Sequence, residues 1–456
     1  MRPACAGLPI YERHEGRDYC VLHFPEKKSE ARFEKAVKNK LALKDYNFSG
    51  VWFSSAANFE GYRFEKDVNF DQCIFESDAS FYKSIFEGAV SFSNVHFKSQ
   101  LIFSGVTVKS LANFSGSTFE EFVDLSANEF LLGASFSGCI FSGPAEFASN
   151  EFARDTDFSG VNFSEWAEFN HSEFKDDASF IGTAFSKLAD FTNTTFDGDL
   201  SFALAVFADE VRFGKPGGGR EVFGDKAKLS FENARIDDPQ RFSFHSVRLK
   251  PGWFFNVDCR KIDFTNVAWF KIGIDENYEP FGQAHKLMRI TYRQLAVNAE
   301  ENHRYREASD FRYLAMDVHR FERTKPGQFQ WHKIAVWELT WWYWLASGYG
   351  ERAFRAFIVL LGIWLLFALS FTQVGFVVSD KNSMNNSDVT PSKYEASGRP
   401  LDFPRAVTYT AGVMTLQKPE PRPQTNTAHA FVLLATVLGP LQAALLALAI
   451  RRKFIR

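Results

Sequence analysis

Residues 158–202 read FSGVNFSEWAEFNHSEFKDDASFIGTAFSKLADFTNTTFDGDLSF, and a phenylalanine returns in this stretch at alternating steps of five and six residues. The pattern extends from Phe48 to Phe213, with only Val108 and Leu125 in place of phenylalanine. On an α-helix, at ~100° per residue, a step of five turns the next side chain by ~140°, so the repeated residues would lie on different faces. The spacing therefore excludes a single helical seam.

The repeat positions form two interleaved sets, each with a period of eleven residues. A small or aliphatic residue stands two positions before most members of the first set, as Ala167 does before Phe169. In an extended segment, side chains two residues apart point to one face. Ser-Gly, Asn and Asp recur between the phenylalanines and form turns. Each unit is therefore predicted to be a very short strand followed by a turn. The sets are Phe48, Phe59, Phe70, Phe81, Phe92, Phe103, Phe114, Leu125, Phe136, Phe147, Phe158, Phe169, Phe180, Phe191, Phe202 and Phe213, and Phe53, Phe64, Phe75, Phe86, Phe97, Val108, Phe119, Phe130, Phe141, Phe152, Phe163, Phe174, Phe185, Phe196 and Phe207.

This pattern resembles the pentapeptide-repeat family, in which Phe or Leu stands at the centre of each unit and a small residue precedes it by two positions. The resemblance implies a right-handed quadrilateral β-helix, which we place at residues 46–272. Because every second unit has an extra residue, one four-sided coil is expected to take about 22 residues. Stacked coils bury their faces against one another, so units that cannot fold alone share one core. Cys73 and Cys139 occupy the small inward position and are predicted to be packing residues.

A glycine-rich segment interrupts the repeat after Phe213. We interpret residues 214–226 as an insertion loop, because the segment lacks the Gly-Lys-Ser/Thr sequence of a phosphate-binding loop. The eleven-residue period then resumes and ends near Trp269, at Phe231, Phe242, Trp253 and Phe264.

Charge is distributed unevenly along the chain. The formal net charge is −3, but residues 48–213 contain 25 Asp and Glu against 9 Lys and Arg, a net of −16 that leaves +13 for the remainder. The acidic outer face of the repeat region is expected to carry a protein partner or to serve solubility. The five cysteines are an odd number and no secretory signal is recognised, which favours a reducing compartment.

Residues 1–45 form a separate N-terminal segment that contains Cys5, His14, Cys20 and His23. Cys20-x-x-His23 has the spacing of a metal half-site, and the segment resembles small Cys/His knuckles that precede repeats of this kind. The resemblance implies a zinc ion held by these four residues, with His14 in place of a usual cysteine. An unliganded N-terminal cap is the alternative. The charged run 30–44 is predicted to be a helix that covers the first coil.

Residues 273–330 change to the helical spacing of apolar residues. Two helices are expected, at 284–299 and 305–323, separated by a polar turn. We interpret them as a helical hairpin connector, with a peptide-binding surface as the alternative.

Residues 331–456 are interpreted as a membrane domain. Five of the ten tryptophans lie between Trp331 and Trp344, as expected for an interfacial helix at 331–346. The segments 355–378 and 428–450 are long and apolar enough to span a bilayer. Basic residues flank both segments, so the positive-inside rule places both termini on the cytoplasmic side of the membrane. We expect this membrane to be a bacterial inner membrane. An aromatic core seam is the alternative for the tryptophans.

A short helix is expected at 402–417 between the two spans. Asp402 suits the N-cap and Pro404 the first turn, and the helix is too short to cross a membrane. Two spans around a short re-entrant helix resemble the two-span cation channels. The Tyr349-Gly-Glu-Arg352 approach to the first span, after the repeats and a helical connector, resembles a bacterial group of pentapeptide-repeat proteins with channel-like C-termini. The resemblance implies a pore lined by Thr410, Met414, Thr415, Leu416 and Gln417, with Gly439 and Pro440 as a gating hinge. The filter sequence of potassium channels is absent.

We therefore expect a channel-like membrane protein, cation-permeable and tetrameric, with a cytoplasmic repeat arm. A membrane-anchored interaction scaffold without conductance is the alternative, and a protein that mimics DNA is less favoured. No nucleic-acid partner is expected. No enzymatic activity is expected either, because the histidines form no spaced set with Ser, Cys or Asp. No cofactor other than zinc is expected.

Overall fold

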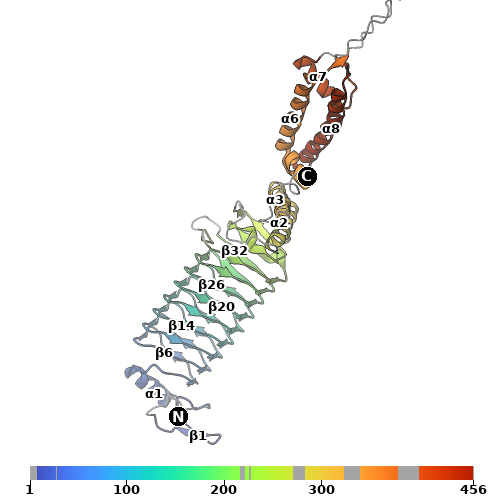
Figure 1. Ribbon diagram of the computed structural model, residues 1–456. Helices are drawn as coiled ribbons and strands as arrows, with labels where there is room; N and C mark the ends of the chain where they lie inside the picture. Colours follow the sequence, from blue (N-terminus) through green and yellow to red (C-terminus); the bar gives the residue numbers. More distant parts are fainter. Residues whose placement is uncertain are drawn as a thin grey trace, which may run out of the picture. The chain divides into compact units, whose positions relative to one another are not determined.

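The structure is a computed structural model that describes residues 8–26, 28–215, 221–224, 227–270, 283–322, 339–377 and 400–454. The chain divides into two compact units on either side of Pro280. The first is a β-solenoid with an N-terminal cap, and the second is a bundle of helices (Figure 1).

The solenoid consists of four parallel sheets in which successive coils pair with a register of 22 residues (Figure 1). Nearly all strands have two residues, and the longest sheet of the described residues has ten, so the solenoid has about ten coils. Between the first and last strand of each sheet, strands follow mostly at steps of 22 residues. The sheets run from β6 (Val68–Asn69) to β33 (Leu229–Ser230), from β3 (Trp52–Phe53) to β34 (Arg235–Ile236), from β4 (Ala57–Asn58) to β37 (Asp263–Thr265), and from β5 (Arg63–Phe64) to β29 (Thr195–Phe196).

Phenylalanine rings fill the interior, which confirms the predicted inward positions. Each ring lies over the equivalent ring of the next coil, as Phe158 does over Phe180 with centroids 4.7 Å apart and planes 3° apart. Rings of opposite faces meet edge to face, as Phe158 and Phe169 do at 5.3 Å and 88°. Both arrangements suit the quadrupole of the aromatic ring. Val108 and Leu125 are as fully buried as the phenylalanines whose places they take.

The regular left-handed turns lie in the five-residue steps, between a first-set residue and the second-set residue that follows it. Two positions after each first-set residue from Phe48 to Phe202, φ is positive, from Gly50 and Gly61 to Asn193 and Leu204. Glycine adopts this conformation without a steric cost, and asparagine tolerates it better than most residues. The five-residue steps therefore contain the left-handed corners, and the extra residue lies in the six-residue steps between them. The handedness of the coil itself stays a prediction.

Polar side chains line two inner corners of the coil, one before the sheet of β3 and one before the sheet of β5, and donate hydrogen bonds to buried carbonyls. Ser84 Oγ donates to the Phe59 carbonyl and Thr183 Oγ1 donates to the Phe158 carbonyl, both at 2.7 Å. Cys73 and Cys139 occupy equivalent positions, and burial raises the pKa of the Cys139 thiol to about 12. Both cysteines are therefore packing residues, as predicted.

The period breaks at the insertion, but the core does not. The strands β31 (Val206–Phe207) and β32 (Val211–Gly214) precede the insertion, and Val222 and Phe223 return into the interior after it. Phe223 lies over Phe196 with centroids 6.0 Å apart. The last coils contain η2 (Pro239–Arg241), β35 (Phe242–His245), β36 (Arg248–Leu249), η3 (Pro251–Phe254) and β38 (Ala268–Trp269).

The N-terminal cap consists of the hairpin β1 (Glu12–His14) and β2 (Arg17–Tyr19) and the helix α1 (Glu30–Ala42). Phe33 and Ala36 of α1 are buried, and Phe33 packs edge to face on Phe53 of the solenoid. The helix thus covers the first coil, as expected for a terminal cap of a repeat protein.

Candidate functional site

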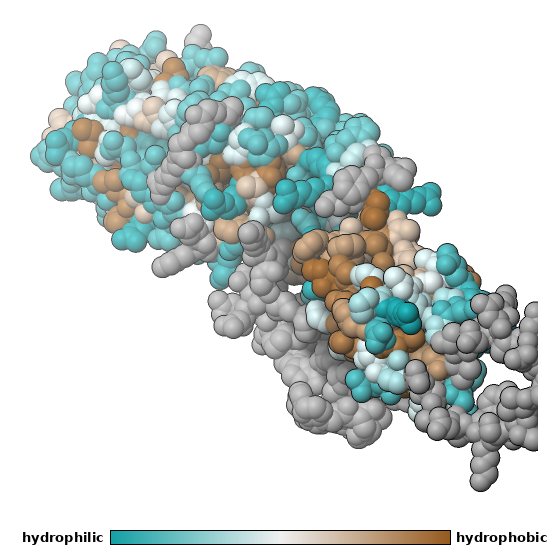
Figure 2. All heavy atoms as spheres, turned by 90° about the horizontal axis from the view of Figure 1, so that it is seen from above, coloured by the Kyte–Doolittle hydropathy of each residue, from teal (hydrophilic) through white to brown (hydrophobic). Residues whose placement is uncertain are grey.

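The helical unit begins with the pair α2 (Gln283–Glu301) and α3 (Tyr305–Glu322) and continues with α5 (Leu339–Ser347), α6 (Ala353–Phe371), α7 (Phe403–Met414) and α8 (Asn426–Phe454). The helices α6 and α8 are long and apolar enough to cross a membrane. Hydrophobic side chains gather on the visible face of this unit, whereas the solenoid surface is mostly hydrophilic (Figure 2). A short antiparallel strand pair lies on either side of α7 in the sequence. It consists of β39 (Phe376–Val377), which follows α6, and β40 (Arg422–Pro423), which precedes α8.

The short helix α7 packs against both apolar helices, near the end of α6 and the start of α8 (Figure 1). Phe367 and Phe371 of α6 and Ala428 of α8 share a buried cluster with Tyr409 and Val413 of α7. The indole Nε1 of Trp364 also donates to the Val407 carbonyl at 3.1 Å. A helix of 12 residues is too short to span a bilayer, so its position depends on these contacts.

The candidate pore residues fall into two groups. Thr410 is fully buried in the bundle, and its Oγ1 donates to the Ala406 carbonyl at 2.7 Å. Thr415, Leu416 and Gln417 are exposed at the C-terminal end of α7. The structure therefore brings together only the residues after the helix as a solvent-facing group, and Thr410 faces the core of the single chain.

The candidate hinge lies inside one continuous helix. Pro440 stands within α8, and Gly439 is buried against Met414 of α7. A Cβ atom placed on Gly439 would lie 2.7 Å from the Met414 Cβ, so the absence of a side chain permits this contact. Gly439 is thus a close packing point between the short helix and the second apolar helix.

A buried glutamine in α8 escaped the sequence analysis. Gln442 Nε2 donates to the Ala346 carbonyl at 2.7 Å and to the Ala356 carbonyl at 2.9 Å. These carbonyls belong to α5 and to the first turn of α6. An unpaired amide in an apolar helix is costly, so both bonds fix α8 against α5 and α6. The available signal was an amide side chain in the uncharged run from Ala428 to Ile450, whose other polar side chains are His429 and Thr436.

The sequence analysis also missed a buried carboxylate that lies just before α6. Glu351 lies in the turn between α5 and α6, and its side chain is 3% exposed. It accepts hydrogen bonds from Ser309 and Arg312 of α3 and from Arg452 of α8. The available signal was an acidic residue directly beside Arg352 at the start of an apolar run.

The tryptophan cluster is only partly described, since Trp331 and Trp337 lie outside the described residues. Trp342 of α5 is 48% exposed, as expected at a membrane surface. Trp344 is instead a packing centre: the guanidinium groups of Arg320 and Arg355 lie 4.4 and 4.8 Å from its ring, and its Nε1 donates to Tyr313 Oη at 3.0 Å. The two readings of the cluster thus apply to different residues.

The N-terminal Cys/His residues form a half-site at most in the described part of the chain. Cys20 Sγ and His23 Nδ1 lie 3.1 Å apart, whereas His14 Nδ1 lies 3.4 Å from Glu26 Oε1. Among the described residues, no group of three His, Cys, Asp or Glu is placed to hold a metal ion. Cys5 lies outside the described residues. The residues present thus fit two of the four predicted zinc ligands, and the zinc site stays a prediction.

A lysine holds this segment to the solenoid. Lys28 is buried, and its Nζ donates to the carbonyls of Leu22, Phe24 and Trp52. Burial lowers the pKa of Lys28 from 10.5 to about 8. The ammonium thus joins the Cys/His turn to the first coil, a role the sequence analysis did not anticipate.

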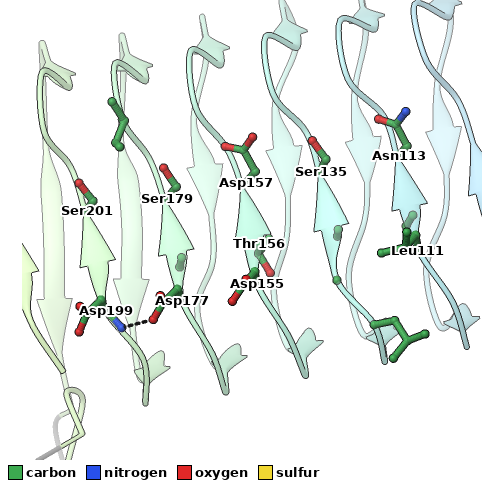
Figure 3. Close-up of a pocket in the computed structure, with 16 residues that line it drawn as sticks. Leu111, Asn113, Ser135, Asp155, Thr156, Asp157, Asp177, Ser179, Asp199 and Ser201 are labelled. Atoms are coloured by element: carbon green, nitrogen blue, oxygen red, sulfur yellow. Dashed lines mark hydrogen bonds between the residues drawn. The ribbon is translucent and has the colours of Figure 1, made fainter. Parts of the chain in front are cut away.

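The outer face of one sheet forms an open groove of about 810 Å³ (Figure 3). Asp155, Asp157, Asp177 and Asp199 line it together with small polar residues. Leu111, Leu132 and Ile181 form apolar parts of its wall and are exposed. The Asp199 N–H donates to Asp177 Oδ1 at 2.7 Å, and the Asp177 residue is exposed. The groove therefore combines negative charge with apolar contacts.

Comparison with known proteins concerns the solenoid alone. Residues 48–96, 81–127 and 169–215 match the family model described as pentapeptide repeats (9 copies). Neither the curated proteins nor the solved structures gave a match. The 22-residue register, the inward phenylalanines and this match agree, and the solenoid of this chain is built of pentapeptide repeats.

Proposed function

We propose that this protein is a cation-permeable membrane channel, or a channel-like protein, whose pentapeptide-repeat solenoid is a cytoplasmic arm that binds a protein partner. The pore would form between copies of the helical unit, most simply four. The proposal places the helical unit in a bacterial inner membrane, with both termini in the cytoplasm.

The observation that carries the proposal is the packing of α7 against both α6 and α8. A short helix held at the end of two apolar helices has the layout of a pore helix, and its C-terminal end carries partial negative charge that favours a cation. Thr415 and Gln417 follow that end and are exposed, so their oxygen atoms are available to a hydrated ion. The basic residues Arg355 and Arg451 near the opposite ends of the apolar helices support the cytoplasmic orientation.

The groove supports the proposed role of the arm. Carboxylates spaced by one coil, beside exposed leucine and isoleucine, are complementary to a protein segment that combines basic and aliphatic side chains (Figure 3). We propose this face as the contact for the cytoplasmic partner.

The test is cation flux into vesicles that contain the purified full-length protein. Gln417→Leu should change the flux at least tenfold, because it removes an amide beside the proposed path. Gln424→Leu, another exposed glutamine of the same connection, should leave the flux within twofold. Flux no greater than in empty vesicles, together with a monomeric particle in detergent, would contradict the channel.

A membrane-anchored interaction scaffold without conductance is the second candidate. The apolar helices favour it to the same extent, because side chains such as Leu366 and Val437 are exposed in one copy and suit contact with lipid. A monomeric particle that still inserts in vesicles and retains partner binding would support this candidate. DNA mimicry is less favoured, since a membrane tether restricts access to DNA-binding enzymes.

A further inference from the structure

We propose that the buried carboxylate of Glu351 is the joint that couples the helix pair α2–α3 to the apolar helices α6 and α8. Any force on the pair would then reach the helices that hold α7. The consequence for ion flux rests on the proposed channel, but the coupling itself does not.

The first step is the geometry of the carboxylate. Glu351 Oε2 accepts from Ser309 Oγ at 2.8 Å, and Oε1 accepts from Arg312 Nε at 3.1 Å. The same Oε1 accepts from Arg452 Nη1 at 3.1 Å. Ser309 and Arg312 belong to α3, and Arg452 lies near the C-terminal end of α8. One side chain at the entrance to α6 thus contacts helices that are more than 100 residues apart in sequence.

The contacts extend beyond the carboxylate on both sides. Arg312 Nη1 donates to Glu300 Oε2 of α2 at 2.7 Å, so both helices of the pair are included. Arg452 Nη1 also donates to the Tyr349 carbonyl at 3.2 Å. Two guanidinium groups and two carboxylates, those of Glu351 and Glu300, therefore join α2, α3, the turn before α6 and the end of α8.

The turn that carries Glu351 is tightly defined. Tyr349 and Gly350 have φ of 61° and 73°, and the Gly350 N–H donates to Ser347 Oγ at 3.0 Å. A Cβ atom on Gly350 would lie 2.7 Å from Tyr343 Oη. The position of Glu351 is thus fixed relative to α5 and α6, as a joint requires.

Because the Glu351 carboxylate is buried, its ion pairs are costly to break. Water screens an exposed pair such as Arg352 and Asp310, whose side chains are 44% and 47% exposed. The Glu351 side chain is 3% exposed, and removing it would leave Arg452 without this carboxylate and Arg312 with that of Glu300 alone. Breaking a buried charge pair is far more disruptive than breaking a surface pair.

The contacts of Trp344 form a second connection within the helical unit, and this connection includes fewer helices than that of Glu351. It joins α3 to α5 and α6 through Arg320 and Arg355, and the contacts described for Trp344 do not include a residue of α8. Glu351 is therefore the side chain to substitute in order to separate α3 from α8.

The experiment measures whether a disturbance of the helix pair reaches α7. In the full-length protein in lipid vesicles, with Cys5→Ser, a Met414→Cys variant reports the contact of α7 with Gly439 by its rate of reaction with a charged thiol reagent. Phe311→Ala then disturbs the α2–α3 interface, where Phe311 is 4% exposed and packs near Tyr292.

We expect Phe311→Ala to raise the thiol rate at position 414 at least fivefold. With Glu351→Gln present, Phe311→Ala should change that rate less than twofold, whereas with Arg352→Gln present the fivefold rise should persist. An equal rise with and without Glu351→Gln would overturn the joint, as would no rise at all in the parent protein. Because the readout is a thiol rate, a protein that conducts no ions would still give a result for the coupling, and circular dichroism checks that each variant is folded.

Discussion

Gly439 of α8 lies directly against Met414 of α7, close enough that a Cβ atom on the glycine would be 2.7 Å from the Met414 Cβ and Cγ. This contact joins the helix too short to span a membrane to the second apolar helix. Gly362 of α6 is different, because a Cβ atom placed on it would have no atom within 4 Å apart from the nearby backbone of its own helix. The two glycines therefore offer a matched pair for a packing test.

Gly439→Ala is expected to destabilise the helical unit by about 1–3 kcal/mol, because a methyl group there forces Met414 or α8 to move. A unit of this size would lose roughly 2–4 °C in melting temperature per kcal/mol. Gly362→Ala should leave the melting temperature in detergent unchanged or slightly raised, since alanine favours a helix over glycine. Equal melting temperatures for the two variants would contradict the packing role of Gly439.

Lys28 should make the stability of the cap depend on alkaline pH. Its pKa is 10.5 when unfolded and about 8 when folded, so between these values the unfolded chain binds more protons. Stability therefore rises with pH from about 8 to 10.5, by up to about 3 kcal/mol. Below pH 8 the cost of burying the ammonium is fully present, and above 10.5 it is gone.

The measurement is the free energy of unfolding in urea for the parent protein and for Lys28→Met, at pH 7.5 and pH 10. The difference between them should shift in favour of the parent protein as the pH rises. Lys38→Met removes a lysine whose side chain is 75% exposed, and its difference from the parent should not change with pH. A constant difference for Lys28→Met would show that the amine has an ordinary pKa.

The core of the solenoid could be predicted from sequence because it depends on one period. Every coil presents the same residue type to the interior, so a short stretch defines the whole series. The left-handed corners had a usable signal too, since glycines such as Gly105 and Gly116 recur at the eleven-residue position. Phe223 was missed because the insertion shifts it out of that period, although it returns to the same stack.

The helical unit was less accessible because its key contacts join distant residues. The sequence places two apolar helices and a short one correctly in order, from composition alone. It does not reveal that Gln442 faces the carbonyls of Ala346 and Ala356, or that Glu351 meets Arg452. Thr410, which we predicted to line a pore, is fully buried in the single chain, and its place in a pore stays a prediction.

Phe158→Ala should destabilise the solenoid by about 3–5 kcal/mol, because the ring is fully buried between Phe136 and Phe180 and the rigid coils cannot close the cavity. Phe158→Leu should cost less than half as much, since Leu125 already occupies an equivalent position. Tyr82→Ala removes an exposed aromatic side chain and should change stability by less than about 0.5 kcal/mol. Urea unfolding of the full-length protein measures all three, and a similar cost for Phe158→Ala and Tyr82→Ala would refute the argument.

Asn150 offers a test of the polar residues inside the solenoid. Its Oδ1 accepts the Asn128 N–H at 2.7 Å, and its Nδ2 donates to the carbonyls of Leu125 and Phe147 at 2.7 and 2.9 Å. Those carbonyls also accept from Asn128 Nδ2 and Ser172 Oγ. The Asn128 N–H is therefore the group that Asn150→Leu would leave unpaired.

A buried unpaired donor costs about 1–3 kcal/mol, so Asn150→Leu should lower the free energy of unfolding by that amount. Asn150→Ser should restore most of it, because Ser172 Oγ accepts the Asn150 N–H in the next coil by the same geometry. Asn162→Leu, on the exposed outer face, provides the control and should be nearly neutral. If Asn150→Ser were as destabilising as Asn150→Leu, the size of the side chain rather than the hydrogen bond to Asn128 would determine the stability of this corner.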